Sequence, residues 1–128
     1  EYGLVLSPGY TRRSILTADG TLYGVTTQYE KEVLATGVKQ AGKAHYMTNN
    51  GEVKEIVSGK TVATDCKSFA EHRYATVIGV LKNDGSCYLG YTYLGDEASY
   101  KKGLQKVMDR VKEVVAGGVC DADNNFYR

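Results

Sequence analysis

Two Asp-Gly pairs, each placed between apolar runs, constrain the fold of this chain more than any other feature. Asp19-Gly20 lies within the run 15–25, and Asp84-Gly85 lies within the run 78–90. A two-residue turn that matches the twist of paired strands needs positive φ angles, which Gly adopts freely and Asp tolerates. We therefore predict two β-hairpins, each containing a Tyr in its second strand and each followed by a helix.

Further strands are predicted from the same kind of pattern. Asn50-Gly51 is a third two-residue turn signal, between residues 45–48 and 52–57. Residues 1–6 and 61–64 read as short strands. The longest hairpin pairs residues 74–81 with 87–94, where β-branched and aromatic residues predominate, so we place it at the centre of the sheet.

Two segments carry helical signals. Thr27-Gln28-Tyr29-Glu30 has the form of a capping box, which predicts a helix from Gln28 to a C-cap at Gly42. A second helix is predicted between Gly95 and Gly117, because apolar residues there recur at the spacing of one helical face. These residues are Tyr100, Leu104, Val107, Met108, Val111, Val114 and Val115.

Together these elements predict an α+β fold. Hairpins join neighbouring strands and short connections avoid crossings, so the simplest arrangement is a single antiparallel sheet with two helices packed on it. The 128 residues form one domain, 1–128. Leu104 and Val111 are expected to be buried against the long hairpin.

The second half of the chain resembles profilin and related small modules. The resemblance rests on Tyr46-Met47, Ser58-Gly59-Lys60, the long hairpin and the closing helix. It implies an intracellular interaction module. The N-terminal helix and Trp with which profilins hold proline-rich ligands have no counterpart, and the segment between Val25 and Tyr46 is too short for that family, so no profilin residue roles are carried over.

Composition excludes several partners. Sixteen basic and fifteen acidic residues leave a formal charge of +1, so no global field attracts nucleic acid or anionic lipid. No apolar run approaches the roughly 20 residues that span a bilayer, and we expect no membrane-spanning segment. Eleven Tyr residues against two Phe and no Trp indicate a Tyr-rich contact surface for a protein partner or second subunit.

The three cysteines suggest an exported protein. The chain begins at Glu1 and not at Met, which is typical of a processed chain. In an oxidising compartment we expect Cys66 and Cys87 to form a disulfide, which leaves Cys120 outside the core to link a partner chain. The alternative is a cytoplasmic protein with three reduced cysteines.

Candidate chemistry centres on Glu71-His72-Arg73. With His45 and with Glu52 or Glu55, this cluster has the base, acid and cation that cleavage of a phosphodiester requires. A surface Glu-His-Arg turn is the competing interpretation.

No metal or cofactor is expected. The chain has no Cys-x-x-Cys or His-x-x-x-His pair to fix two metal ligands on one element. Residues 121–125 begin like a calcium loop but lack its turn Gly and closing Glu, and read as a solvated acidic tail.

The favoured function is that of a small, non-enzymatic binding or effector-type protein, possibly toxin-like and exported, that acts through a Tyr-rich surface and a covalent partner. The alternatives are an intracellular profilin-like module and a small secreted ribonuclease-like enzyme.

Overall fold

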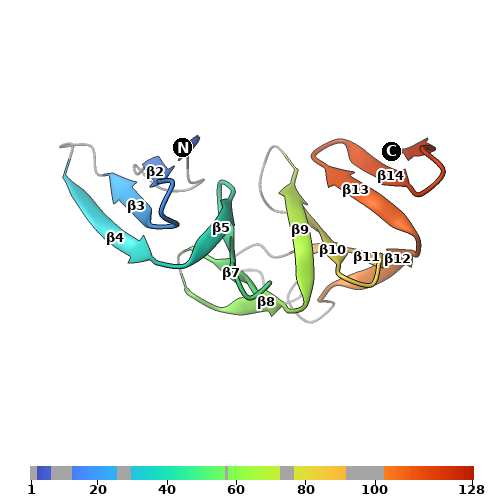
Figure 1. Cartoon of the computed structure of the whole chain (residues 1–128), viewed down its shortest axis with the longest axis horizontal. Coiled ribbons are helices and arrows are strands. Elements are labelled where there is room, and N and C mark those ends of the chain that lie inside the picture. Colours follow the sequence, from blue (N-terminus) through green and yellow to red (C-terminus); the bar gives the residue numbers. More distant parts are fainter. Residues whose placement is uncertain (1–2, 7–12, 26–29, 57, 73–76, 92–102) are drawn as a thin grey trace.

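Four antiparallel sheets follow one another in chain order (Figure 1). The computed structural model describes residues 3–6, 13–25, 30–56, 58–72, 77–91 and 103–128. The first sheet contains β1 (Gly3–Leu6), β2 (Arg13–Leu16), β3 (Leu22–Val25) and β4 (Lys31–Ala35). The second contains β5 (Val38–Ala41), β6 (His45–Thr48), β7 (Val53–Glu55) and β8 (Thr61–Ala63).

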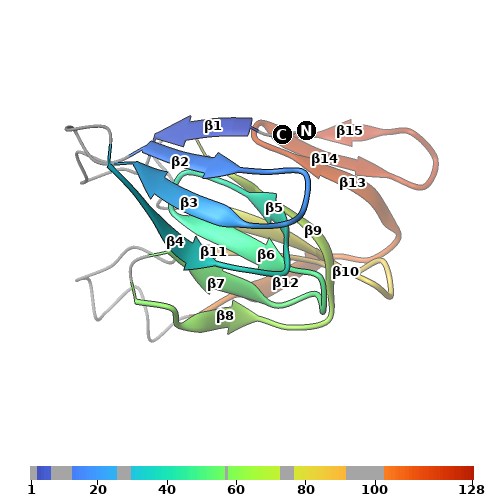
Figure 2. The same ribbon diagram turned by 60° about the vertical axis from the view of Figure 1, so that its left-hand side comes forward.

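The third and fourth sheets continue the same up-and-down order (Figure 2). The third contains β9 (Cys66–Glu71), β10 (Val77–Lys82), β11 (Cys87–Tyr91) and β12 (Gln105–Met108). The fourth contains β13 (Val111–Val115), β14 (Gly118–Asp121) and β15 (Phe126–Tyr127). The first three sheets are four-stranded meanders, an arrangement also found in the blades of β-propellers, and the fourth has three strands in the described residues.

The predicted α+β class is therefore wrong, because the described residues contain strands and no helix. In the same ranges no helix is long and apolar enough to cross a bilayer. The domain is also not built on a single sheet. The resemblance to profilin is not supported either, because it depended on the closing helix, which is absent from the described residues.

The residues of the first predicted helix form the strands β4 and β5. Residues 26–29, which carry the capping signal, lie outside the described residues. Gly37 has a φ of 65°, a left-handed conformation that no α-helix continues through. The chain passes there from the first sheet into the second, so the apolar residues of this segment are divided between two sheets and do not line one helical face.

The described residues of the second predicted helix include the strands β12 and β13. Arg110 has a φ of 57° and separates the two strands. Val111 is buried as predicted, whereas Leu104 is half-buried and packs against the core from outside a strand. A register shift between Val111 and Glu113 places Val111 and Val114 on the buried side, which reproduces a three-residue helical spacing in an extended chain.

The predicted hairpins are confirmed. Strands β2 and β3 pair around Asp19-Gly20, and β6 and β7 pair around Asn50-Gly51. In the long hairpin, β10 and β11 pair from Val77 opposite Tyr91 to Leu81 opposite Cys87. The three turn glycines have φ angles of 82° to 89°, which is the conformation for which Gly is needed.

One hydrogen-bond pattern recurs between consecutive sheets. The turn Gly of each of the first three sheets accepts a bond from the first residue of the next sheet: Val38 N to Gly20 O at 2.9 Å, Cys66 N to Gly51 O at 2.9 Å, and Val111 N to Gly85 O at 2.8 Å. The repeated turn therefore positions each new sheet on the preceding one.

Three apolar clusters lie between the sheets. Leu22, Val38 and Tyr46 join the first and second sheets. The second and third sheets share the cluster of Met47, Val53, Ala63, Cys66, Phe69, Ile78 and Val80. The third and fourth share Leu81, Cys87, Val111, Val114 and Val119. The core is thus divided into interfaces between neighbouring sheets.

Candidate functional site

His45 and Glu71 meet between the second and third sheets although they are 26 residues apart. His45 Nδ1 lies 2.7 Å from Glu71 Oε2, and their side chains are 1% and 6% exposed. Glu71 also accepts bonds from the backbone N–H groups of Lys43 and Ala44, the latter at 2.9 Å. The Glu71 carboxylate thus contacts three successive residues, Lys43, Ala44 and His45. These contacts hold the β5–β6 connection against the end of β9.

This pair is shielded from solvent. A group so deeply buried contacts a dissolved RNA chain only if the two sheets separate, so we assign no catalytic role to His45 or Glu71. Glu55 lies opposite His45 in the β6–β7 pairing and is also buried. Its Oε1 accepts a bond from the Ser58 hydroxyl at 2.8 Å.

The other members of the predicted catalytic cluster do not join this pair. His72 is exposed and follows β9, and Glu52 precedes β7. Arg73 lies outside the described residues. Glu71 and His72 therefore differ in burial although they are neighbours in the sequence, because successive residues at the end of a strand point to opposite faces.

The predicted Cys66–Cys87 disulfide is wrong, because both thiols are free and buried. Cys66 lies on β9 and Cys87 on β11, and β10 runs between them. Two strand spacings separate the residues by about 10 Å, whereas a disulfide requires Cα atoms within about 7 Å. Burial raises the pKa of both thiols.

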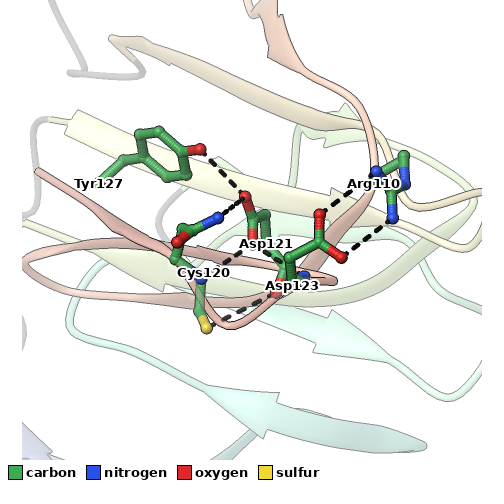
Figure 3. A network of polar contacts seen from close by, with 6 residues as sticks. Arg110, Cys120, Asp121, Asp123 and Tyr127 are labelled. Atoms are coloured by element: carbon green, nitrogen blue, oxygen red, sulfur yellow. Dashed lines mark hydrogen bonds and ion pairs between the residues drawn. The ribbon is translucent and has the colours of Figure 1, made fainter.

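Cys120 lies in the fourth sheet beside a polar loop (Figure 3). It is free and half-buried, and its Sγ lies 3.7 Å from the Asp121 carbonyl oxygen. The sequence placed it outside the core at the end of a helix, whereas it stands within β14 opposite Phe126. Its role in linking a partner chain stays a prediction.

The segment that begins like a calcium loop is a self-contained turn (Figure 3). Asp121 Oδ1 accepts bonds from the backbone N–H groups of Asp123 and Asn125, both at 2.9 Å. Asp121 Oδ2 accepts the Tyr127 hydroxyl at 3.0 Å. The Asn125 backbone donor, followed by the Tyr127 hydroxyl, holds the pKa of Asp121 below its usual value. Asp123 pairs with Arg110 at 3.4 Å.

A groove lies between the third and fourth sheets, at the end of the interface that carries the β13–β14 turn. Its volume is about 340 Å³, within the range of small-molecule sites. Leu89, Val107 and Met108 line it from the third sheet, and Val114, Val115 and Val119 line it from the fourth. We call this cavity the apolar groove.

Large apolar side chains of the apolar groove face solvent. Val107 is 51% exposed, Val115 41% and Leu89 38%. These exposed residues stand next to one another around one cavity, whereas isolated exposed apolar residues are ordinary on protein surfaces. Apolar surface gathered in a concavity is typical of an interaction site.

Glycines shape the apolar groove. A Cβ at Gly79 would lie 2.9 Å from Leu89 Cδ2 and 3.0 Å from Val114 Cγ2, so a side chain there would push the walls apart. Gly118 permits close approach of β15, because a Cβ there would overlap the Tyr127 carbonyl oxygen. At Gly117, which also lines the groove, a Cβ would meet no atom within 4 Å, so a larger side chain has room there.

Few polar groups border the apolar groove. Among the described lining residues His72, Tyr127 and Arg128 are the polar ones, and none of the lining residues is acidic. The Tyr127 hydroxyl already donates a hydrogen bond to the Asp121 carboxylate, and this bond raises the pKa of Tyr127. Arg128 is the one Lys or Arg residue in the described lining.

The sequence interpretation assigned no site to this groove. The spacing of Val107, Val114 and Val115 in the sequence predicts the buried stripe of a helix and not the wall of a groove. The available signal was the density of β-branched residues in Val111–Val115, which favours a strand.

The predicted Tyr-rich surface involves tyrosines that are spread over all four sheets. Tyr23, Tyr46, Tyr88 and Tyr127 each lie in a different sheet. Lys31 Nζ lies 5.0 Å from the Tyr23 ring centroid and Lys82 Nζ lies 5.4 Å from that of Tyr88. A contact surface made by tyrosines stays a prediction.

The sequence was compared with protein-family models and with curated proteins. No protein-family model matches the chain, and no curated protein matches it.

Proposed function

We propose that this chain is a non-enzymatic binding module that holds a small apolar molecule in the apolar groove. The observation that carries the proposal is the gathering of the exposed side chains Leu89, Val107 and Val115 around one cavity of about 340 Å³. Covering apolar surface contributes roughly 25 cal/mol for each Å² removed from water. The ligand replaces the solvent that these side chains otherwise face.

The rest of the interface supports a preformed site. Val114 and Val119 belong to the buried cluster that joins the third and fourth sheets, and both also line the groove. The groove walls are therefore anchored in the core. Binding to a preformed wall loses little conformational entropy, which favours affinity for a small molecule.

The test is titration with a neutral probe, N-phenyl-1-naphthylamine, whose fluorescence rises in apolar surroundings. We expect saturable binding to the wild-type protein. Val107→Lys introduces a charge into the groove wall and should weaken binding by about tenfold or more, equivalent to about 1.4 kcal/mol. Gly117→Leu should have a similar effect, because it adds a bulky side chain at a lining position of the groove.

Val33→Lys is the matched control. Val33 is 58% exposed on β4, and Val107 is 51% exposed on β12, so each valine lies on the fourth strand of its sheet. The control variant should bind the probe like the wild type. Absence of saturable binding, or equal weakening by Val33→Lys and Val107→Lys, would contradict the proposal.

A further inference from the structure

The fourth sheet repeats the turn of the three sheets before it. Asn124 stands where those sheets have a turn Gly, since its N–H donates to the carbonyl three residues earlier, as theirs do, and its φ of 66° is also left-handed. In each of the first three sheets the carbonyl at this position accepts an N–H from the following sheet, whereas within the described residues no backbone N–H donates to the Asn124 carbonyl oxygen. The fourth sheet is therefore built like a sheet that another sheet follows.

The side chains beside this turn show which side of the fourth sheet is uncovered. In each of the first three sheets, the residue two positions after the turn residue is 0% exposed and packs against the following sheet; these residues are Leu22, Val53 and Cys87. Phe126 stands at this position in the fourth sheet and is 55% exposed. Cys120 lies directly opposite Phe126, and its neighbour Val119 packs against the third sheet, so Cys120 and Phe126 point away from the third sheet. We call the side that carries them the open face of the fourth sheet.

The first sheet has an uncovered side of the complementary kind. Ile15 lies opposite Tyr23, and Tyr23 lies opposite Val33, so the three share one side. Leu22, next to Tyr23, packs against the second sheet, so this side faces away from the second sheet, and Val33 is 58% exposed on it. In the later sheets the residue at the position of Ile15, five before the turn residue, packs against the preceding sheet; these residues are Tyr46, Val80 and Val119. The first sheet thus presents the side that in every later sheet receives a preceding sheet.

The two uncovered sides lie at opposite ends of the row of sheets (Figure 1). We propose that the open face of the fourth sheet binds the first sheet of a second copy of this chain. Phe126 and Cys120 then pack against the side that carries Ile15, Tyr23 and Val33, as the corresponding side chains do at the three interfaces within one copy. This inference goes beyond the proposed function, because none of these five residues lines the apolar groove.

Sedimentation velocity over the micromolar range tests the proposal. The wild type should self-associate, and Phe126→Lys and Val33→Lys should each weaken this association about tenfold or more, because either lysine places a charge in an apolar contact. Both positions are more than half exposed, so both variants should keep the circular dichroism spectrum of the wild type. An equimolar mixture of the two variants should form a heterodimer, because a head-to-tail contact uses different sides of the two copies and each variant retains the side that the other has lost.

Thr61→Lys is the matched control, because Thr61 is exposed on β8, away from both uncovered sides. It should associate like the wild type. A wild-type protein that stays monomeric over this range, or equal weakening by Thr61→Lys, would overturn the proposal. Association that survives Val33→Lys but not Phe126→Lys would indicate contact between two fourth sheets and would overturn the assignment of the first sheet as the partner. Binding of the neutral probe tests the apolar groove separately, so failure of either proposal leaves the other standing.

Discussion

Replacing Glu71 should reveal how strongly the second and third sheets are held together. Its carboxylate accepts one bond from the His45 ring and two from the backbone of Lys43 and Ala44. Glu71→Ala removes all three acceptor contacts at once. The His45 ring then loses this acceptor at a position where its side chain is only 1% exposed.

The magnitude follows from the number and kind of these bonds. A hydrogen bond to a charged group contributes about 1.5 to 3 kcal/mol, but three bonds to one carboxylate are not additive. Removing one partner of a buried pair costs about 3 to 5 kcal/mol. We expect Glu71→Ala to lower the free energy of unfolding by that amount. Glu71→Gln, which keeps one acceptor oxygen, should cost about half as much.

Gly42 offers an independent test of the same contact. A Cβ at Gly42 would overlap Glu71 Oε1, and its nearest neighbours are all atoms of the Glu71 side chain. Gly42→Ala should therefore displace the carboxylate from its donors and destabilise the protein. In the Glu71→Ala background this obstacle is gone, so the second substitution should cost little.

Urea unfolding followed by circular dichroism measures all four proteins of this cycle. We expect the double variant to be about as stable as Glu71→Ala, with a coupling of about 2 to 3 kcal/mol. Additive losses would show that Gly42 and Glu71 act independently. A loss below about 1 kcal/mol in Glu71→Ala would refute the assignment of this carboxylate as a main link between the sheets.

Three further substitutions test the turns. Gly51→Ala should destabilise more than Gly85→Ala in thermal unfolding, because both glycines have left-handed φ angles but only a Cβ at Gly51 would press on a backbone atom, the Cys66 carbonyl oxygen at 2.8 Å; equal losses would contradict this reasoning. The pKa of Asp121 is lowered in the folded protein from its usual value of 3.8, so its ionised form stabilises the fold above that pH and the benefit disappears as the pH falls. Asp121→Asn should therefore have a lower melting temperature than the wild type at pH 6 and a smaller difference at pH 2.5, and a difference that does not change with pH would refute the linkage.

The hairpins were predictable from the sequence because their signals are local. Asp19-Gly20, Asn50-Gly51 and Asp84-Gly85 each provide the positive φ that a tight turn requires. Asp19 and Asp84 also accept bonds from the residue two positions later. Such turns form from neighbouring residues, and a pattern read over ten residues contains all of the participants.

The choice between helix and strand for 105–115 was decided only by tertiary structure. Apolar residues three and four apart indicate a helix, yet Val111 and Val114 are buried because a bulge in β13 places both against the third sheet. The left-handed φ of Arg110 gives no sequence signal comparable to a Gly. The gain from packing two sheets together outweighs a helical pattern whose residues are mainly β-branched.

The sequence by itself determined the turns, most of the strands and the near-neutral charge of this protein. Tertiary structure decided how the strands are divided among four sheets and which distant residues meet. Glu71 reaches His45, and Val107 comes to line one cavity with Val115, because the sheets stack on one another. Contacts between sheets join residues far apart in the chain, and their partners cannot be recognised from local spacing.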